Sequence, residues 1–407
     1  MRLRFLAFVF GFLSFGWLNV NRAPAPMPIV RSIVTPWTKR PHAKLLGAAA
    51  SLRDMLKNLA ASFFAPLACN AGVLNYFLDP LPVFPYQQAP QKENMPRSVH
   101  IRDLVVNISG TLDVSGGTGD GTLNTEAIAR LIRRITVRWD GFDLVQPMEA
   151  RDLAALGRRL TGQPLSGTPV TIPGIQTTNF ELKFFIPFAR SYNADPFDTA
   201  LPPLQVRKEF VVEIEWETAR SNAVVGTSLG SGAIITGGDR VVALTNVQAT
   251  VLPRQARNAA RPWYIPQISA YETVQFNAAN PRLVLDMEQN EAFDAVLFRT
   301  LEDSLRDPAN LINTLTFETK NVKVLEDVPF TDLRAIEEDM FPGVVDASEV
   351  GNLFLRFADG GKLGNAVNPA QLTLPKFEFD VATPNNNPGV IRAITMELLS
   401  IPGVTVR

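Results

Sequence analysis

The residues best suited to chemistry are few in this chain and poorly placed for it. The 407 residues include one cysteine, Cys69, and two histidines, His42 and His100. One cysteine cannot close a disulfide within the chain, and these three side chains are too few for a Cys/His metal cluster. A histidine-dependent triad would have to use His42 or His100, both in or beside a proline-rich stretch. The sequence therefore favours two solvated histidines over a catalytic base.

Acidic residues offer the other candidate chemistry. Glu213 and Glu215, or the run 337–339, could in principle form the paired carboxylates of a glycosidase. However, Glu213 and Glu215 alternate with apolar residues as on a solvated sheet face, and the run 337–339 continues a helical pattern. The acidic residues within 286–294 match no calcium-loop spacing. We therefore predict no catalytic, cofactor-binding or metal-binding residues, and a protein that is not an enzyme.

Two glycine-rich segments resemble phosphate or nucleophile loops only superficially. The segment GGTGDGT at 116–122 lacks the Gly-Lys-Ser/Thr ending of a phosphate-binding loop and lies between two strand patterns. The segment SLGSG at 228–232 begins with serine, where a nucleophile elbow requires glycine. Both segments are typical of turns or hinges.

Composition narrows the class of protein. The 39 Lys and Arg residues balance 40 Asp and Glu residues, so the basic excess typical of a nucleic-acid binder is absent and we expect no specific nucleic-acid partner. The 31 prolines and 26 glycines separate short runs rich in Val, Ile, Phe and Thr, as in an all-β protein. At 407 residues the chain is long enough for two domains and an additional segment.

The beginning of the chain is open to three interpretations. Residues 2–25 combine basic residues, the apolar run 5–18 and an Ala-Pro-Ala ending, which resembles a secretory signal peptide. An apolar run of 14 residues is short for a membrane-spanning helix, which needs about 20. The stretch is a signal peptide, a short membrane-associating segment, or sequence upstream of a true start at Met27 or Met95.

An amphipathic helix is predicted over 44–65, because apolar residues recur there mostly every three or four positions. This helix either packs on the protein's own domains or a neighbouring subunit, or docks on a membrane surface. We regard the range 1–94 as a mostly helical or irregular N-terminal arm. The candidate membrane-facing residues are Leu45, Leu52, Met55, Leu56, Leu59, Phe63 and Phe64.

An internal duplication organises the rest of the chain. Residues 131–156 align without a gap with residues 311–336, at an offset of 180, with 6 of 26 positions identical. The identical pairs include Asp152 with Asp332. Most apolar positions of the first segment are also apolar in the second, which indicates the same buried faces in two copies.

Strand patterns occur in the same order on both sides of residue 260. Short helices are expected at 150–160 and 331–339, each after a strand pattern and before another. This arrangement predicts an all-β fold of two tandem eight-stranded jelly-roll β-sandwiches, at 95–260 and 261–407. The expected strands are 99–114, 132–145, 180–188, 208–216, 240–252, 271–276, 282–287, 295–300, 313–325, 352–358, 376–381 and 390–399.

A duplicated sandwich with segments such as LIRRITVRWDGFDLV and FELKFFIPFARSYNADPFDTALPP is similar to the double jelly-roll major capsid proteins of the PRD1 and adenovirus lineage, of the tailless, internal-membrane bacteriophage type. The resemblance covers about residues 99–400. It implies a homotrimer whose six jelly rolls form a pseudo-hexagonal capsomer of an icosahedral shell. It also implies neighbouring capsomers, the viral membrane and minor capsid or vertex proteins as partners, and a location in the virion.

The alternative that the residues leave open is a secreted or surface β-sandwich that binds carbohydrate or another ligand. That function would use the signal-like start at residues 1–25.

Overall fold

The computed structural model gives the fold of the C-terminal four-fifths of the chain. The chain separates into two compact units, Met1–Ala65 and Pro66–Arg407, and every residue described below belongs to the second. The described residues are 82–87, 89–96, 100–115, 120–123, 128–161, 166–167, 171–173, 176–189, 199–202, 209–217, 235–236, 241–256, 264–287, 292–302, 307–319, 322–340, 351–357 and 376–400.

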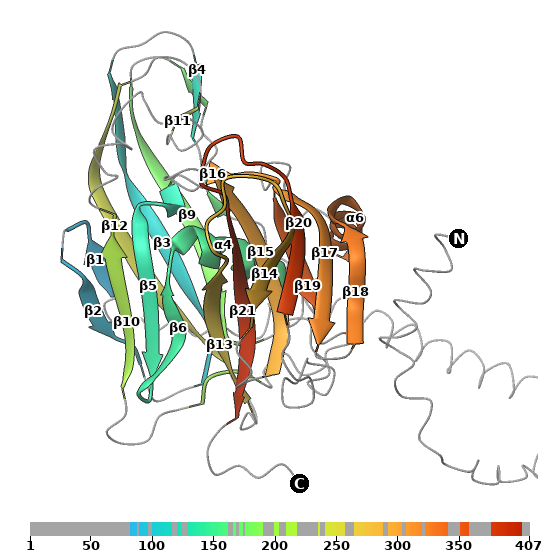
Figure 1. Cartoon of the computed structure of the whole chain (residues 1–407). Coiled ribbons are helices and arrows are strands. Elements are labelled where there is room, and N and C mark those ends of the chain that lie inside the picture. Colours follow the sequence, from blue (N-terminus) through green and yellow to red (C-terminus); the bar gives the residue numbers. More distant parts are fainter. Residues whose placement is uncertain are drawn as a thin grey trace, which may run out of the picture. The chain divides into compact units, whose positions relative to one another are not determined.

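The first half of this unit is a sandwich of two four-stranded layers with small additions (Figure 1). One layer has the order β1-β12-β3-β9, formed by Val83–Pro85, Val241–Ala256, His100–Ser115 and Gln176–Pro187. The other has the order β2-β10-β5-β6, formed by Gln91–Asn94, Phe210–Trp216, Ile132–Trp139 and Phe142–Met148. The additions are β7 (Ser166–Gly167), beside β9, and a small sheet of β11 (Ile235–Thr236), β4 (Asp120–Leu123) and β8 (Thr171–Pro173).

The second half repeats this arrangement strand for strand. One layer has the order β13-β21-β15-β19, formed by Tyr264–Glu272, Val390–Ser400, Ala292–Glu302 and Asn352–Arg356, with β16 (Asp307–Pro308) paired to the end of β15. The other has the order β14-β20-β17-β18, formed by Asn280–Asp286, Lys376–Val381, Ile312–Thr319 and Val322–Pro329. Along the chain each half runs through its eight strands in the same order, which is the jelly-roll connection.

The duplication extends to the residue pairing of one hairpin. In β5 and β6 the pairs are 135 with 148, 137 with 145, 138 with 143, and 139 with 142. In β17 and β18 the pairs are 315 with 328, 317 with 325, 318 with 323, and 319 with 322. Every pair is displaced by 180, and both hairpins have irregularities at the same places. The offset found in the sequence is therefore a structural repeat.

A helix follows this hairpin in each half: α4 (Ala150–Thr161) after β6 and α6 (Phe330–Met340) after β18. Alanine, leucine and arginine favour the helical backbone of α4. An acidic residue in its first turn, Asp152, and basic residues in its last, Arg158 and Arg159, suit the helix dipole. The two helices begin 180 residues apart, as predicted.

The two sandwiches are joined by a continuous sheet. β6 of the first half lies parallel to β13 of the second, with Val145 opposite Ile268, so a nine-stranded sheet crosses from one half to the other. One core cluster fills the first sandwich and includes residues from the outer face of the layer β13-β21-β15-β19. A second cluster, around Phe298, Phe377 and Phe379, fills the second sandwich.

Three details differ from the sequence prediction. β1 and β2 lie before residue 95, in the range assigned to the arm, and pair with β12 and β10; a chain starting at Met95 would lack both strands. The segments 132–145 and 313–325, each expected as one strand, are two strands each, β5 and β6 in the first and β17 and β18 in the second. The first segment turns at Asp140 and Gly141, which have φ values of 54° and 83°. Positive φ at two adjacent residues is the geometry of a tight hairpin turn. The strand expected at 271–276 lies earlier, at β13.

Candidate assembly interface

Some of the residues singled out from the sequence lie in the described part of the chain and others do not. The seven candidate membrane-facing residues, and also His42 and Cys69, lie outside the described residues. Glu213 and Glu215 lie on β10 between buried neighbours, and they pair with Lys92 and Arg133, as a solvated sheet face requires. Within the described ranges, no group of three or more His, Cys, Asp or Glu residues could hold a metal ion.

The most unusual chemistry in the described part is a buried ionic network around α4. Asp152 is fully buried, and its carboxylate accepts hydrogen bonds from Arg299 of β15, at 2.7 Å, and from Arg392 of β21. Arg392 also donates to Glu272 of β13, at 2.7 Å from Nε to Oε1. The network therefore ties a helix of the first half to three strands of the second.

Charge, rather than exposure, sets the ionisation of this network. Burial alone would raise the pKa of Asp152, but the positive charges of Arg392 and Arg299 outweigh it and lower that pKa from 3.8 to about 2. Burial lowers the pKa of the neighbouring Arg151 to about 10. Burial also opposes the charge of Arg392, yet the carboxylate of Asp152 raises its pKa overall. Asp152 is thus an anion held between cations at neutral pH.

A second buried ion pair connects the two helices. Nε of Arg159, in α4, lies 2.6 Å from Oε1 of Glu337, in α6, and both side chains are inaccessible to solvent. The other carboxylate oxygen of Glu337 accepts the backbone N–H of Phe354 at 3.2 Å. Burial raises the pKa of Glu337 despite the charge of Arg159. Glu337 therefore lies in the predicted helix but is part of the packing between the halves.

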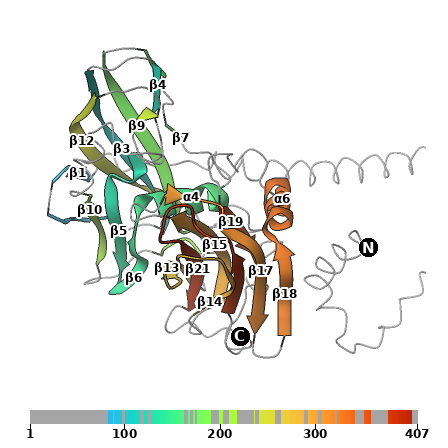
Figure 2. The ribbon, with the colours of Figure 1, turned by 45° about the horizontal axis from the view of Figure 1, so that its top comes forward.

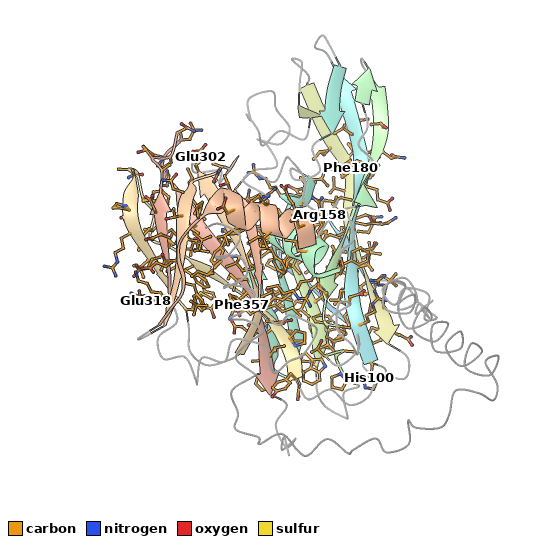
Figure 3. All side chains as sticks on the ribbon, turned by 90° about the vertical axis from the view of Figure 1, so that its right-hand side faces the viewer. His100, Arg158, Phe180, Glu302, Glu318 and Phe357 are labelled. Carbon is orange, nitrogen blue, oxygen red and sulfur yellow. The ribbon has the colours of Figure 1, made fainter. Side chains whose placement is uncertain are left out.

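Figures 2 and 3 place this network in the fold. α4 lies between the strands of the two halves, and α6 lies at the end of the second half beside β18 (Figure 2). Arg158, at the end of α4, lies between the two sets of strands (Figure 3). Beside the network, a polar cleft of about 590 Å³ is lined from the first half by Arg130, Arg133 and Arg134 and from the second by Glu272 and Arg392. Its basic and acidic side chains are mixed, so the cleft has no marked preference for an anion or a cation.

The outer end of the second half is open where that of the first is covered. β18 is the last strand of its sheet and pairs only with β17 among the described residues. On this end Val324 is 37% exposed, and Asp332, Ala335, Glu338 and Asp339 of α6 are exposed. The structure therefore presents an uncovered strand edge and an acidic helix at the position that α4 and β6 occupy inside the chain.

No helix in the described part of the chain is both long and apolar enough to cross a membrane.

Comparison with known proteins gives a structural match without a sequence match. No protein-family model matches the chain, and no curated protein matches its sequence. The STIV MCP crystal structure is similar with a TM-score of 0.57 and 12% identity, over 80% of this chain and 96% of that one. The structure of Sulfolobus Turreted Icosahedral Virus gives 0.57 and 11%, over 81% and 90%. The major capsid protein P2 from bacteriophage PM2 gives 0.47 and 10%, over 80% and 99%.

At these identities the similarity concerns the fold. It covers both sandwiches of this chain in a single match, in agreement with the repeat of eight strands found in each half. The chain has the double jelly-roll fold of viral major capsid proteins.

Proposed function

We propose that this chain is the major capsid protein of a virus, with a structural and not an enzymatic role, located in the shell of the virion. The observation that supports this most directly is the repeat itself. Two sandwiches of the same strand order lie in one chain and are joined by a buried ionic network. Two similar units joined in one chain can occupy neighbouring positions in a tiled surface.

The assembly unit we propose is a homotrimer. Three copies of a two-sandwich chain place six similar units in a ring, which gives a pseudo-hexagonal capsomer for an icosahedral shell. Sedimentation velocity of the purified full chain tests this, with a trimer and larger closed particles expected. Negative-stain electron microscopy of the larger fraction should then reveal shells with hexagonal surface units. A chain that stays monomeric at all concentrations, and forms no particles, would contradict the proposal.

We further propose a division of the chain near residue 260, with an N-terminal arm directed toward an internal membrane. In the described part, strands up to Ala256 belong to the first sandwich and strands from Tyr264 to the second. The arm would contact lipid through the apolar residues of the predicted helix, named above from Leu45 to Phe64. Neighbouring capsomers and minor capsid or vertex proteins are the other proposed partners, with no specific nucleic acid.

Membrane contact can be tested with vesicles of phosphatidylcholine and phosphatidylglycerol. The full chain should co-sediment with these vesicles, and the double substitution Leu56→Glu and Phe63→Glu should abolish co-sedimentation. Asp54→Leu, which adds an apolar residue on the opposite face of the predicted helix, is the control and should retain binding. Equal binding by all three proteins would exclude this helix as the lipid contact.

A further inference from the structure

The contact between the two halves provides a template for a contact between two copies. In the first half, β6 lies parallel to β13 at the edge of the layer β13-β21-β15-β19, and α4 lies against the outer face of that layer. Leucines of α4 and outer-face residues of that layer share one core cluster. The outer-face residues in the cluster include Ala295, Leu297, Phe354, Ile394 and Met396, each at most 1% exposed.

The equivalent residues of the first half can be identified from the strand pairing. Gly157 of α4 lies against the backbone of Phe185, and position 337 of α6, 180 residues later, bonds the backbone of Phe354. Phe185 therefore corresponds to Phe354. Their partners, Val105 and Leu297, correspond in turn.

Two residues further along, Asn107 corresponds to Arg299, and its β12 partner Thr250 corresponds to Arg392. The outer face of β1-β12-β3-β9 is thus the counterpart of the face that the chain covers internally. It is less buried: Val105, Asn107, Phe185, Thr250 and Leu252 are all partly exposed. The two equivalent outer faces thus differ in burial: that of β13-β21-β15-β19 is buried within the chain, and that of β1-β12-β3-β9 is partly exposed.

We propose that α6 of one copy packs on the outer face of β1-β12-β3-β9 of a second copy, with β18 beside the edge strand β1, repeating between chains the contact that α4 and β6 make within one. The inference rests on the proposed capsid function, and it names the surfaces through which the copies meet. One side is formed by β18, which among the described residues pairs only with β17, and by the exposed acidic residues of α6. The other side carries Lys183, which is 42% exposed and pairs with Glu181 of its own strand at 2.8 Å, so it can also face the acidic residues of α6.

The chemistry of the two contacts differs at one point. Asp152 meets two arginines within the chain. Its counterpart Asp332 would meet Thr250 of the second copy, a hydroxyl, and Asn107, an amide that also donates to Glu181 of its own chain at 2.9 Å. Hydrogen bonds between a carboxylate and neutral groups are weaker than those to guanidinium groups. The contact between copies therefore lacks the ion pairs that Asp152 makes within the chain. Two copies can then separate while the two halves of each copy stay together.

A charge exchange tests the proposed pairing. Asp332→Lys should raise the dissociation constant for association of copies at least tenfold, measured by sedimentation velocity on the full chain. Asp286→Lys makes the same charge change at an exposed position of β14, the opposite edge of the same sheet, and should leave association unchanged. Adding Asn107→Asp and Thr250→Asp to the Asp332→Lys chain should restore most of the affinity.

Cysteine cross-linking supplies a second measurement that does not depend on affinity. Two chains carrying Cys69→Ser, one with Asp332→Cys and the other with Thr250→Cys, should form a disulfide-linked pair when mixed and oxidised, because a disulfide needs Cα atoms within about 7 Å. A Cys69→Ser chain with Asp286→Cys, mixed with the Thr250→Cys chain, is the control and should not cross-link.

The outcomes separate this inference from the proposed function. If trimers or particles form but neither charge exchange nor cross-linking involves Asp332, the surfaces assigned here are wrong and the capsid proposal stands. If the wild-type chain does not associate at all, both are wrong. Rescue by the exchanged charges together with the selective cross-link would establish the contact.

Discussion

The helices α4 and α6 are copies of one element in two different environments. They follow hairpins of identical register, and they share an aspartate at equivalent positions, Asp152 and Asp332. Nearly every residue of α4 is buried, including Asp152, whereas α6 exposes Asp332 and much of one face. The repeat therefore fixes where each helix lies, and the neighbouring half determines whether it is covered.

The difference shows which contacts hold two copies of one fold together within a chain. On the covered side, arginines of β15 and β21 surround Asp152. Removing one partner of such a group leaves an uncompensated charge in the interior. The contact between the halves therefore depends on a buried carboxylate whose removal leaves positive charge less well compensated in the interior. Asp332 of α6 is exposed, so its removal leaves no uncompensated charge in the interior.

The largest expected effect comes from removing the same side chain from both helices. Asp152→Ala should lower the free energy of unfolding by about 3 to 5 kcal/mol, because the buried Arg299 and Arg392 would each lose a carboxylate partner. Asp332→Ala should change it by less than about 0.5 kcal/mol, as is usual for an exposed surface residue. Urea unfolding, followed by tryptophan fluorescence at concentrations where copies are separate, measures both.

Equal losses from the two alanine variants would mean that the two helices are not in different environments. The further variant Asp152→Asn separates charge from shape, since it keeps the size of the side chain and removes its charge. It should resemble Asp152→Ala more closely than the wild type.

The next effect concerns how closely α4 approaches its own sandwich. A Cβ atom at Gly157 would lie 2.1 Å from the carbonyl oxygen of Phe185, so Gly157→Ala must displace either the helix or β9. A loss of about 1 to 3 kcal/mol is expected from such overpacking. Ala335→Gly, at an exposed position of α6, should cost only about 1 kcal/mol through helix propensity. Thermal unfolding followed by circular dichroism compares the two, and an unchanged Gly157→Ala protein would contradict the close approach.

Low pH should weaken the contact that Asp152 of α4 makes with the second half. The pKa of Asp152 is lowered from 3.8 to about 2 in the folded protein, so its contribution to stability is complete above its ordinary value and is lost as the pH falls from about 4 toward 2. The loss amounts to about 2 kcal/mol. Urea unfolding measured at intervals between pH 5 and pH 2 should reveal this loss in the wild type. If Asp152→Asn, which cannot titrate there, loses stability equally over that range, Asp152 is not responsible.

The sequence predicted the repeat well because the repeat is local. A hairpin and a helix within 26 residues keep their apolar spacing, so their register could be found by alignment alone. The ionic network could not be predicted, since Asp152 is separated by 147 and 240 residues from the arginines that it meets, and charged residues are normally exposed. β1 and β2 were missed because they are short and lie among prolines. The Asp140-Gly141 turn was predictable, because Asp-Gly is the usual signal for a tight hairpin.

The smallest expected loss of stability concerns the turn residue Gly141 in the first of the two hairpins. Gly141 has a φ of 83° and would have no atom within 4 Å of an added Cβ, so its substitution meets backbone strain and no steric contact. Gly141→Val should therefore cost about 1 to 2 kcal/mol. The duplication places Asn321 at the equivalent position of the second hairpin, and asparagine tolerates this backbone region better than valine does. Gly141→Asn should accordingly cost less than about 1 kcal/mol, measured by thermal unfolding. If valine and asparagine are equally harmful, side-chain type is not what this turn selects.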